Sequence, residues 1–198
     1  NVDNADFTGS GQFDVAIQKP VNVTVNKTEY EYSPDTFMLD YTIDSGIDYS
    51  LKFTNSAGIE IDYITAITEP LDAGEYTYTL TLNGDYYIAG QPLGTKQISG
   101  KFTILPKNIA LEEYDETVVY SGSDFVFENP YAYEVRAEFF QNGKAVTPKN
   151  VGKYDVTITI TQPNYIGSTT GTLEITKKEV TLTANAASSV YGEQFSTL

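Results

Sequence analysis

The residues of this chain that could do chemistry are carboxylates, lysines and tyrosines, because its 198 residues include no histidine and no cysteine. A serine or cysteine nucleophile activated by histidine is therefore excluded. Disulfide bonds and thiolate metal sites are excluded as well. Two carboxylates could still hydrolyse a glycosidic bond, but no acidic pair lies in a sequence context that indicates a cleft. We expect no enzyme, and no catalytic, cofactor or metal site.

Acidic clusters are the residues that come closest to a metal site. Asp40, Asp44 and Asp48 recur every four residues, and further acidic groups lie within residues 3–6 and 112–115. Calcium requires several oxygen ligands at once. None of these groups has the spacing of an EF-hand or of a glycine–aspartate repeat. Solvated acidic loops are therefore favoured over calcium sites.

The sixteen tyrosines could form a binding surface, since tyrosine suits contacts with carbohydrate and protein. Tyr86 with Tyr87, and Tyr131 with Tyr133, are the candidates. Most tyrosines lie in strand patterns, however, where the ring is buried and the hydroxyl reaches the surface. Carbohydrate platforms usually use tryptophan too, and the chain has none. The tyrosines are therefore predicted to be core residues.

Lysines and asparagines offer two covalent possibilities. Lys27, Lys52 and Lys153 could form isopeptide bonds with Asn or Asp, although the sequence identifies no partner. Asn22 and Asn26 each begin an N-glycosylation pattern, but so short a pattern often occurs by coincidence. The net charge of −15 argues against nucleic acid, because phosphate binding needs clustered Lys and Arg.

Strands must position these residues, because apolar and polar residues alternate along much of the chain. The predicted inward faces are Val21, Val23 and Val25; Tyr76, Tyr78, Leu80 and Leu82; Val156, Ile158 and Ile160; and Leu173 and Ile175. Asn142-Gly143 predicts a two-residue hairpin turn, and Asn55–Gly58 is the equivalent turn earlier in the chain. The pattern predicts an all-β fold of tandem antiparallel β-sandwich modules of immunoglobulin-like type.

An internal repeat sets the predicted domain boundaries. Gly74 and Tyr87, like Gly152 and Tyr165, enclose alternating threonines and apolar residues and lie 13 positions apart. Repeats of this length indicate small domains in series. We expect one module over residues 21–107 and another over residues 108–178. Residues 1–20 would be the last strands of a preceding module, and residues 179–198 the first strand of a following one.

These end segments suggest a mode of self-association. Unpaired strand edges invite strand addition, so residues 7–20 and 179–198 could pair between copies, head to tail. The alternative is that residues 7–20 belong to the sheet of the first module. The joints between modules hold only Lys-Pro, Pro-Lys or Lys-Lys, and such short connections favour an extended rod.

Several of these segments resemble a known family. Thr181–Asn185 followed by Tyr191-Gly192 resembles the opening of MBG-type repeats in large bacterial surface proteins, and Val151–Gly167 resembles their latter half and that of related bacterial immunoglobulin-like modules. Tyr120-Ser-Gly122 is similar to their Tyr-x-Gly turn. Residues 21–107 match less closely, with Tyr32-Ser-Pro34 at that turn. The resemblance implies secreted or cell-surface, adhesin-like architecture and supplies no site residues.

The expected function is therefore structural. No run of about 18 apolar residues is present, so no membrane contact is expected within this segment. We expect an extracellular, acidic stalk or spacer that extends an adhesin or another distal domain. The alternative is a module that binds a host protein or glycan through the longer loops of the first module, near residues 59–73 and 88–101, because binding sites are often carried on loops.

Overall fold

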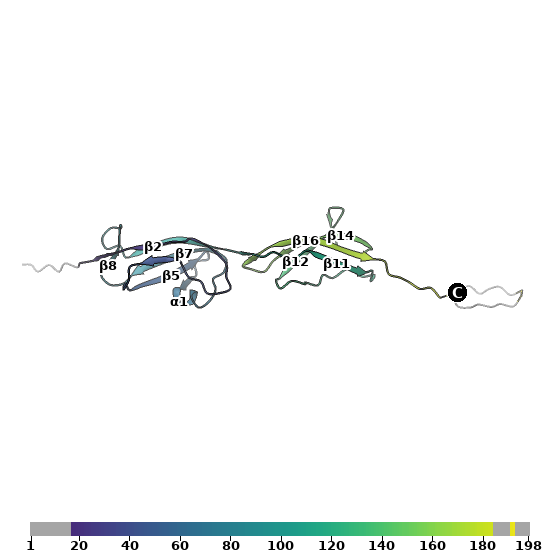
Figure 1. Cartoon of the computed structure of the whole chain (residues 1–198), viewed down its shortest axis with the longest axis horizontal. Helices are drawn as coiled ribbons and strands as arrows, with labels where there is room; N and C mark the ends of the chain where they lie inside the picture. The colour runs from purple at the N-terminus through teal and green to yellow at the C-terminus, as the bar shows by residue number, and fades with distance from the viewer. Residues whose placement is uncertain (1–16, 184–190, 193–198) are drawn as a thin grey trace, which may run out of the picture. The chain divides into compact units, whose positions relative to one another are not determined.

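A computed structural model describes residues 17–183, 191 and 192 of the chain (Figure 1). The fold is all-β, as predicted, with a single helical turn, α1 (Tyr63–Ala66), among the described residues. The chain forms two compact units. Unit 1 extends to Ala110 and also includes Ile160–Gly167, whereas unit 2 comprises Leu111–Thr159 and the chain from Ser168 onward.

Unit 1 is built from a five-stranded sheet in the order β3-β9-β7-β5-β6 and from three short strand pairs, β1-β8, β2-β4 and β10-β15. Its strands are β1 (Lys19–Val21), β2 (Val23–Val25), β3 (Glu29–Glu31), β4 (Tyr41–Ile43), β5 (Tyr49–Asn55), β6 (Glu60–Asp62), β7 (Gly74–Leu82), β8 (Tyr86–Ile88), β9 (Gln97–Leu105), β10 (Lys107–Asn108) and β15 (Tyr165–Ile166).

Unit 2 is built around a second five-stranded sheet, in the order β11-β16-β14-β12-β13. Its strands are β11 (Tyr114–Val119), β12 (Val135–Gln141), β13 (Lys144–Ala145), β14 (Gly152–Ile160) and β16 (Ser168–Thr176). Counted in chain order, each five-stranded sheet has its first strand beside its last and its fourth strand in the centre. The repeat seen in the sequence is therefore also a repeat of strand order.

The sheets are mixed, whereas the sequence predicted antiparallel pairing throughout. The central pairs are antiparallel, as predicted. The first strand of each sheet instead runs parallel to the last: β3 pairs with β9, and β11 pairs with β16. The short pairs β1-β8 and β10-β15 are parallel too. Antiparallel neighbours can be joined by a tight turn, but a first and a last strand are joined only through the rest of the domain, so their direction is free of that constraint.

The core of each unit lies on the inward faces that the alternation predicted. In unit 1, Leu80 and Leu82 are buried, and Tyr76 stacks on Phe102 with ring centroids 5.2 Å apart. In unit 2, Ile158 and Leu173 are fully buried. Loop residues complete each core, such as Leu39 and Leu71 in unit 1 and Phe125 and Phe127 in unit 2. The intervening threonines face outward on the central strands.

The predicted turns form with the backbone that their residues favour. Asn142 and Gly143 have φ angles of 53° and 73°, as a two-residue hairpin between β12 and β13 requires. Gly58 ends the turn that begins at Asn55, with a φ of 79°. Between residues 59 and 73, the predicted loop carries α1, whose first turn is capped by the Asp62 carboxylate. Within the described residues, no helix is long and apolar enough to cross a bilayer.

Candidate functional site

The aspartates considered as calcium ligands form hydrogen bonds that hold short strands together. The carboxylate of Asp44 accepts from the backbone N–H of Asn22 at 2.8 Å, and the carboxylate of Asp40 accepts from the side-chain amide of Asn26 at 2.8 Å. These bonds link the ends of β2 and β4. No group of three acidic residues able to hold a metal is present in the part of the chain that the structure describes. The acidic group at residues 3–6 lies outside that part.

The two asparagines that begin glycosylation patterns are the donors in these same contacts. The amide nitrogen of Asn22 lies 3.1 Å from the Asp44 carboxylate, so both asparagines hold aspartates across β2 and β4. A glycan on either nitrogen would replace one of its amide protons. The geometry therefore gives these asparagines a structural role.

The three candidate isopeptide lysines contact other groups. Lys52 forms an ion pair with Glu60 at 3.1 Å, and Lys153 forms one with Glu174 at 3.5 Å. Lys27 lies over the ring of Tyr30, 4.8 Å from its centroid. All three lysines face solvent, where such contacts contribute at most about 1 kcal/mol each. Their surroundings differ from the buried, apolar setting in which a lysine amine is uncharged and nucleophilic.

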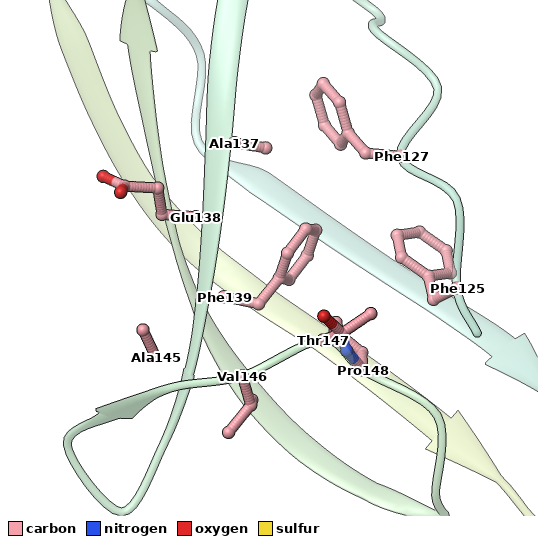
Figure 2. A pocket seen from close by; sticks show the side chains of 9 residues that line it. All are labelled: Phe125, Phe127, Ala137, Glu138, Phe139, Ala145, Val146, Thr147 and Pro148. Carbon is pink, nitrogen blue, oxygen red and sulfur yellow. The ribbon is translucent and has the colours of Figure 1, made fainter.

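An apolar pocket of about 530 Å³ lies in unit 2 (Figure 2). Phe139 of β12 points into it and faces Phe125 and Phe127 on the segment that follows β11. The backbone N–H of Phe125 donates to the carbonyl of Pro148 at 2.7 Å and holds that segment beside the β13 end of the sheet. Glu138 borders the pocket but points away from the rings. The pocket thus offers apolar contact and no pair of titratable groups for catalysis.

A second pocket, of about 390 Å³, lies in unit 1 beside the inserted segment 59–73. Tyr49 and Tyr63 form its aromatic walls, and Lys52 and Asp62 are its charged residues. The hydroxyl of Tyr49 shares a hydrogen bond of 2.6 Å with the hydroxyl of Tyr41. Aromatic rings beside charged and hydroxyl groups form a surface that could bind a polar ligand with an apolar face.

Two tyrosines have strongly raised pKa values. Burial is the main cause of the raised pKa of Tyr41, and its hydrogen bond to Tyr49 adds to the effect. Burial likewise raises the pKa of Tyr114, whose hydroxyl donates to the carboxylate of Glu116. Both phenols stay protonated at neutral pH and act as hydrogen-bonding groups at the edge of a core. The candidate surface tyrosines Tyr86, Tyr87, Tyr131 and Tyr133 are all partly buried, and the Tyr131 hydroxyl donates to the carbonyl of Glu112.

Unit 1 contains one polar contact between distant parts of the chain that the sequence did not predict. Asn164 donates from its side-chain amide to the Asp72 carboxylate at 2.8 Å and accepts from the backbone N–H of Ala73 at 2.7 Å. Next to it, the rings of Tyr32 and Tyr165 meet edge to face with centroids 5.4 Å apart. Burial in this contact raises the pKa of Tyr32. Asn164 has a left-handed φ of 71°, which asparagine adopts more readily than most residues. Its residue type was therefore the signal in the sequence that pointed to a special turn.

Comparison with known protein families finds a match within the second half of the chain. Residues 126–179 match the model of the MBG domain. Over these residues the chain is similar to the MBG domain. The match confirms the resemblance seen at Val151–Gly167 and covers β12 to β16, including Phe139 and Leu173 of the core. MBG domains are typically non-catalytic repeat domains associated with bacterial surface proteins. No curated protein matches the chain.

Proposed function

We propose that this chain is a non-catalytic stalk segment of a bacterial cell-surface protein, which holds an adhesin or another distal domain away from the cell. The MBG domain in unit 2 and the shared strand order of the two sheets support this proposal. In this account, residues 21–107 and 108–178 are successive modules and residues 179–198 belong to a following one, while Lys19 and Pro20 lie in β1, which pairs with β8 of unit 1. The protein would act outside the cell, at the bacterial surface.

The parallel pairing of first and last strands is the observation that carries the proposal. In unit 2, β11 pairs with β16 over six residues, from Tyr114 opposite Gly171 to Val119 opposite Thr176. Tension from the two ends of a domain would pull the start of β11 and the end of β16 in opposite directions. In a parallel pair these points lie at opposite ends of the ladder, so all of its hydrogen bonds are strained together rather than one after another. Such an arrangement suits a segment that transmits tension.

Stretching the chain from its two ends in single-molecule force spectroscopy tests this function. The rate of forced unfolding reports the unfolding barrier under tension, which is the property that a stalk needs. We expect a separate force peak for each unit before the chain extends fully. A chain that extends smoothly, with no resolved peak, would contradict the proposal.

A binding module is the second candidate, and the tyrosine-lined pocket of unit 1 is the observation that favours it. That pocket includes Asp62 and Tyr63 from the inserted segment 59–73, on which a pure spacer would not depend. Titration with a panel of mono- and oligosaccharides, followed by amide NMR shifts, tests it. Shifts gathered around Tyr49 and Tyr63, and lost in Lys52→Ala, would support binding. Unchanged spectra would remove glycans from consideration at this pocket.

A further inference from the structure

The contact that Asn164 makes within unit 1 has two halves, each built from few residues. One half is the acceptor surface, formed by Tyr32, Asp72 and Ala73. The other half is the turn Asn164-Tyr165, whose side chains meet that surface. The backbone carbonyl of Asp72 is also held in place, by the hydroxyl of Tyr76 at 2.8 Å.

Unit 2 carries the same acceptor surface, made of Tyr120, Asn150 and Val151. The backbone N–H of Tyr120 donates to Thr176 at 2.9 Å, as that of Tyr32 donates to Leu105 at 2.8 Å. The hydroxyl of Tyr154 donates to the carbonyl of Asn150 at 2.8 Å, which matches the bond from Tyr76 to Asp72.

This second surface faces solvent in the structure. Asn150 is exposed, and 44% of the surface of Val151 is accessible, whereas the corresponding Ala73 is half-buried beneath Asn164. The hydrogen-bonding groups equivalent to those that receive Asn164 are thus displayed on unit 2.

Unit 1 in turn displays a counterpart of the Asn164-Tyr165 turn, at Asp85-Tyr86. The backbone N–H of Lys19 donates to the carbonyl of Asp85 at 3.0 Å, and that of Lys107 donates to the carbonyl of Asn164 at 2.9 Å. The parallel pairs that follow have the same register, with Lys19 opposite Tyr86 and Lys107 opposite Tyr165.

The two turns differ in their backbone. The turn before Tyr86 is one residue shorter, counted from the end of the preceding strand at Leu82 rather than Ile160. Its left-handed residue is Gly84, with a φ of 75°, instead of the residue that precedes the tyrosine. Asp85 is exposed, so its carboxylate faces solvent.

The exposed surface of unit 2 and the exposed turn of unit 1 carry complementary side chains, with aspartate and asparagine exchanged relative to the observed contact. In the observed contact, an aspartate on the surface, Asp72, accepts from an asparagine on the turn, Asn164. In the displayed halves, the surface carries Asn150 and the turn carries Asp85. We propose that the Tyr120–Asn150–Val151 surface of one copy binds the Asp85-Tyr86 turn of a second copy, so that chains associate head to tail.

This association differs from the strand pairing between chain ends that the sequence suggested, because it uses the side chains of folded units. The Asn150 amide donates to the Asp85 carboxylate, which also accepts from the backbone N–H of Val151. Charged acceptors make stronger hydrogen bonds than neutral ones, so the reversed pair retains the chemistry of the observed one.

Paramagnetic NMR on the full chain tests the contact even if association is weak. The chain has no cysteine, so Asn83→Cys places a single spin label beside the turn. This labelled chain is mixed with a ¹⁵N-labelled second copy. We expect broadening of the amides of Tyr120, Asn150 and Val151. Absence of broadening, uniform broadening, or broadening confined to other residues would overturn the proposal.

Charge variants separate this contact from any other association. Asn150→Asp in the ¹⁵N-labelled copy places two carboxylates face to face, and like charges in contact disfavour binding. We expect the broadening to disappear. Adding Asp85→Asn to the spin-labelled copy recreates the Asp–Asn pair of residues 72 and 164, and the broadening should return. If the broadening in both variant mixtures equals that of the unaltered chain, the proposed contact is wrong.

Discussion

Gly171 lies where the backbones of β11 and β16 come closest. A Cβ atom at this position would lie 1.7 Å from the carbonyl oxygen of Tyr114, which belongs to the paired strand. Backbone atoms can make room only by moving the strand. The first strand of unit 2 therefore depends on the absence of a side chain at this residue.

Gly171→Ala should lower the free energy of unfolding of unit 2 by about 1–3 kcal/mol, the usual cost of overpacking. Chemical denaturation followed by circular dichroism measures the change. The exposed neighbour Thr170→Ala serves as the control and should change stability much less. Equal effects of the two substitutions would show that the close approach does not matter.

Tyr114 makes the stability of unit 2 depend on alkaline pH. Its folded-state pKa is raised by burial and by the bond to Glu116, so the folded protein keeps a phenol proton that the unfolded chain loses above pH about 10. Stability is therefore complete below that pH and falls as pH rises further. Denaturation at pH 8 and pH 11 should show this fall, and the fall should be smaller in Tyr114→Phe. An identical fall in both proteins would contradict the assignment.

Residue burial could largely be predicted from the sequence, because alternation along a strand is a local property. Ile158, Leu173 and Ile175 were predicted to face inward, and they are buried. The contact of Asn164 with Asp72 could not be predicted, since these residues are 92 positions apart and both are polar. The aromatic pocket of unit 2 was missed for a similar reason: Phe125 and Phe127 lie outside any regular strand.

At the scale of elements, the ladder between β11 and β16 is the feature with the clearest functional meaning. The backbone N–H of Tyr120, just past β11, donates to Thr176 of β16. Alternate residues of a strand direct their amides to the same side, so the amide of Val118 faces β16 and that of Val119 faces away. The two valines thus offer a matched pair for testing the ladder.

Val118→Pro should weaken unit 2, because proline removes one ladder donor. Leaving its acceptor on β16 unpaired costs about 1–3 kcal/mol. Val119→Pro should cost less, since its amide is outside the ladder, and Val118→Ala corrects for the lost side-chain packing. Thermal unfolding of the three variants gives the comparison. If Val119→Pro proves less stable than Val118→Pro, the hydrogen bonds lie on the other side of β11.

The direction of strand pairing was the main element-scale feature that the sequence did not predict. Alternation has the same period in parallel and antiparallel strands, so it identified the inward face of β16 without giving the direction of the strands beside it. Turn chemistry did reveal direction where strands are adjacent in sequence, as at Asn142-Gly143. Without a tight turn between first and last strands, no local signal distinguished the two possibilities.

At the scale of the whole molecule, the units do not follow the order of the chain. Residues 160–167 come after most of unit 2 in sequence but belong to unit 1. Asn164 fastens this segment through Asp72 and Ala73. The stability of unit 1 therefore depends on residues from the second repeat.

Asn164→Gly should lower the free energy of unfolding of unit 1 by about 1–3 kcal/mol, since it removes two side-chain hydrogen bonds while permitting the left-handed φ. Asn142→Gly is the matched control, because Asn142 also has a positive φ but is exposed at a hairpin. Hydrogen exchange at the amides of unit 1 reports the loss. If Asn164→Gly leaves this exchange unchanged, the fastening is not structural.

The measurement that tests the stalk account most directly is forced unfolding of unit 2 in two directions. Cysteines introduced at Glu113 and Lys177 apply force to opposite ends of the β11–β16 ladder, and cysteines at Glu113 and Ser168 apply it near one end. We expect a clearly higher unfolding force for the first pair, because the ladder is then sheared rather than peeled. Equal forces, or a lower force for Glu113 and Lys177, would contradict the stalk account.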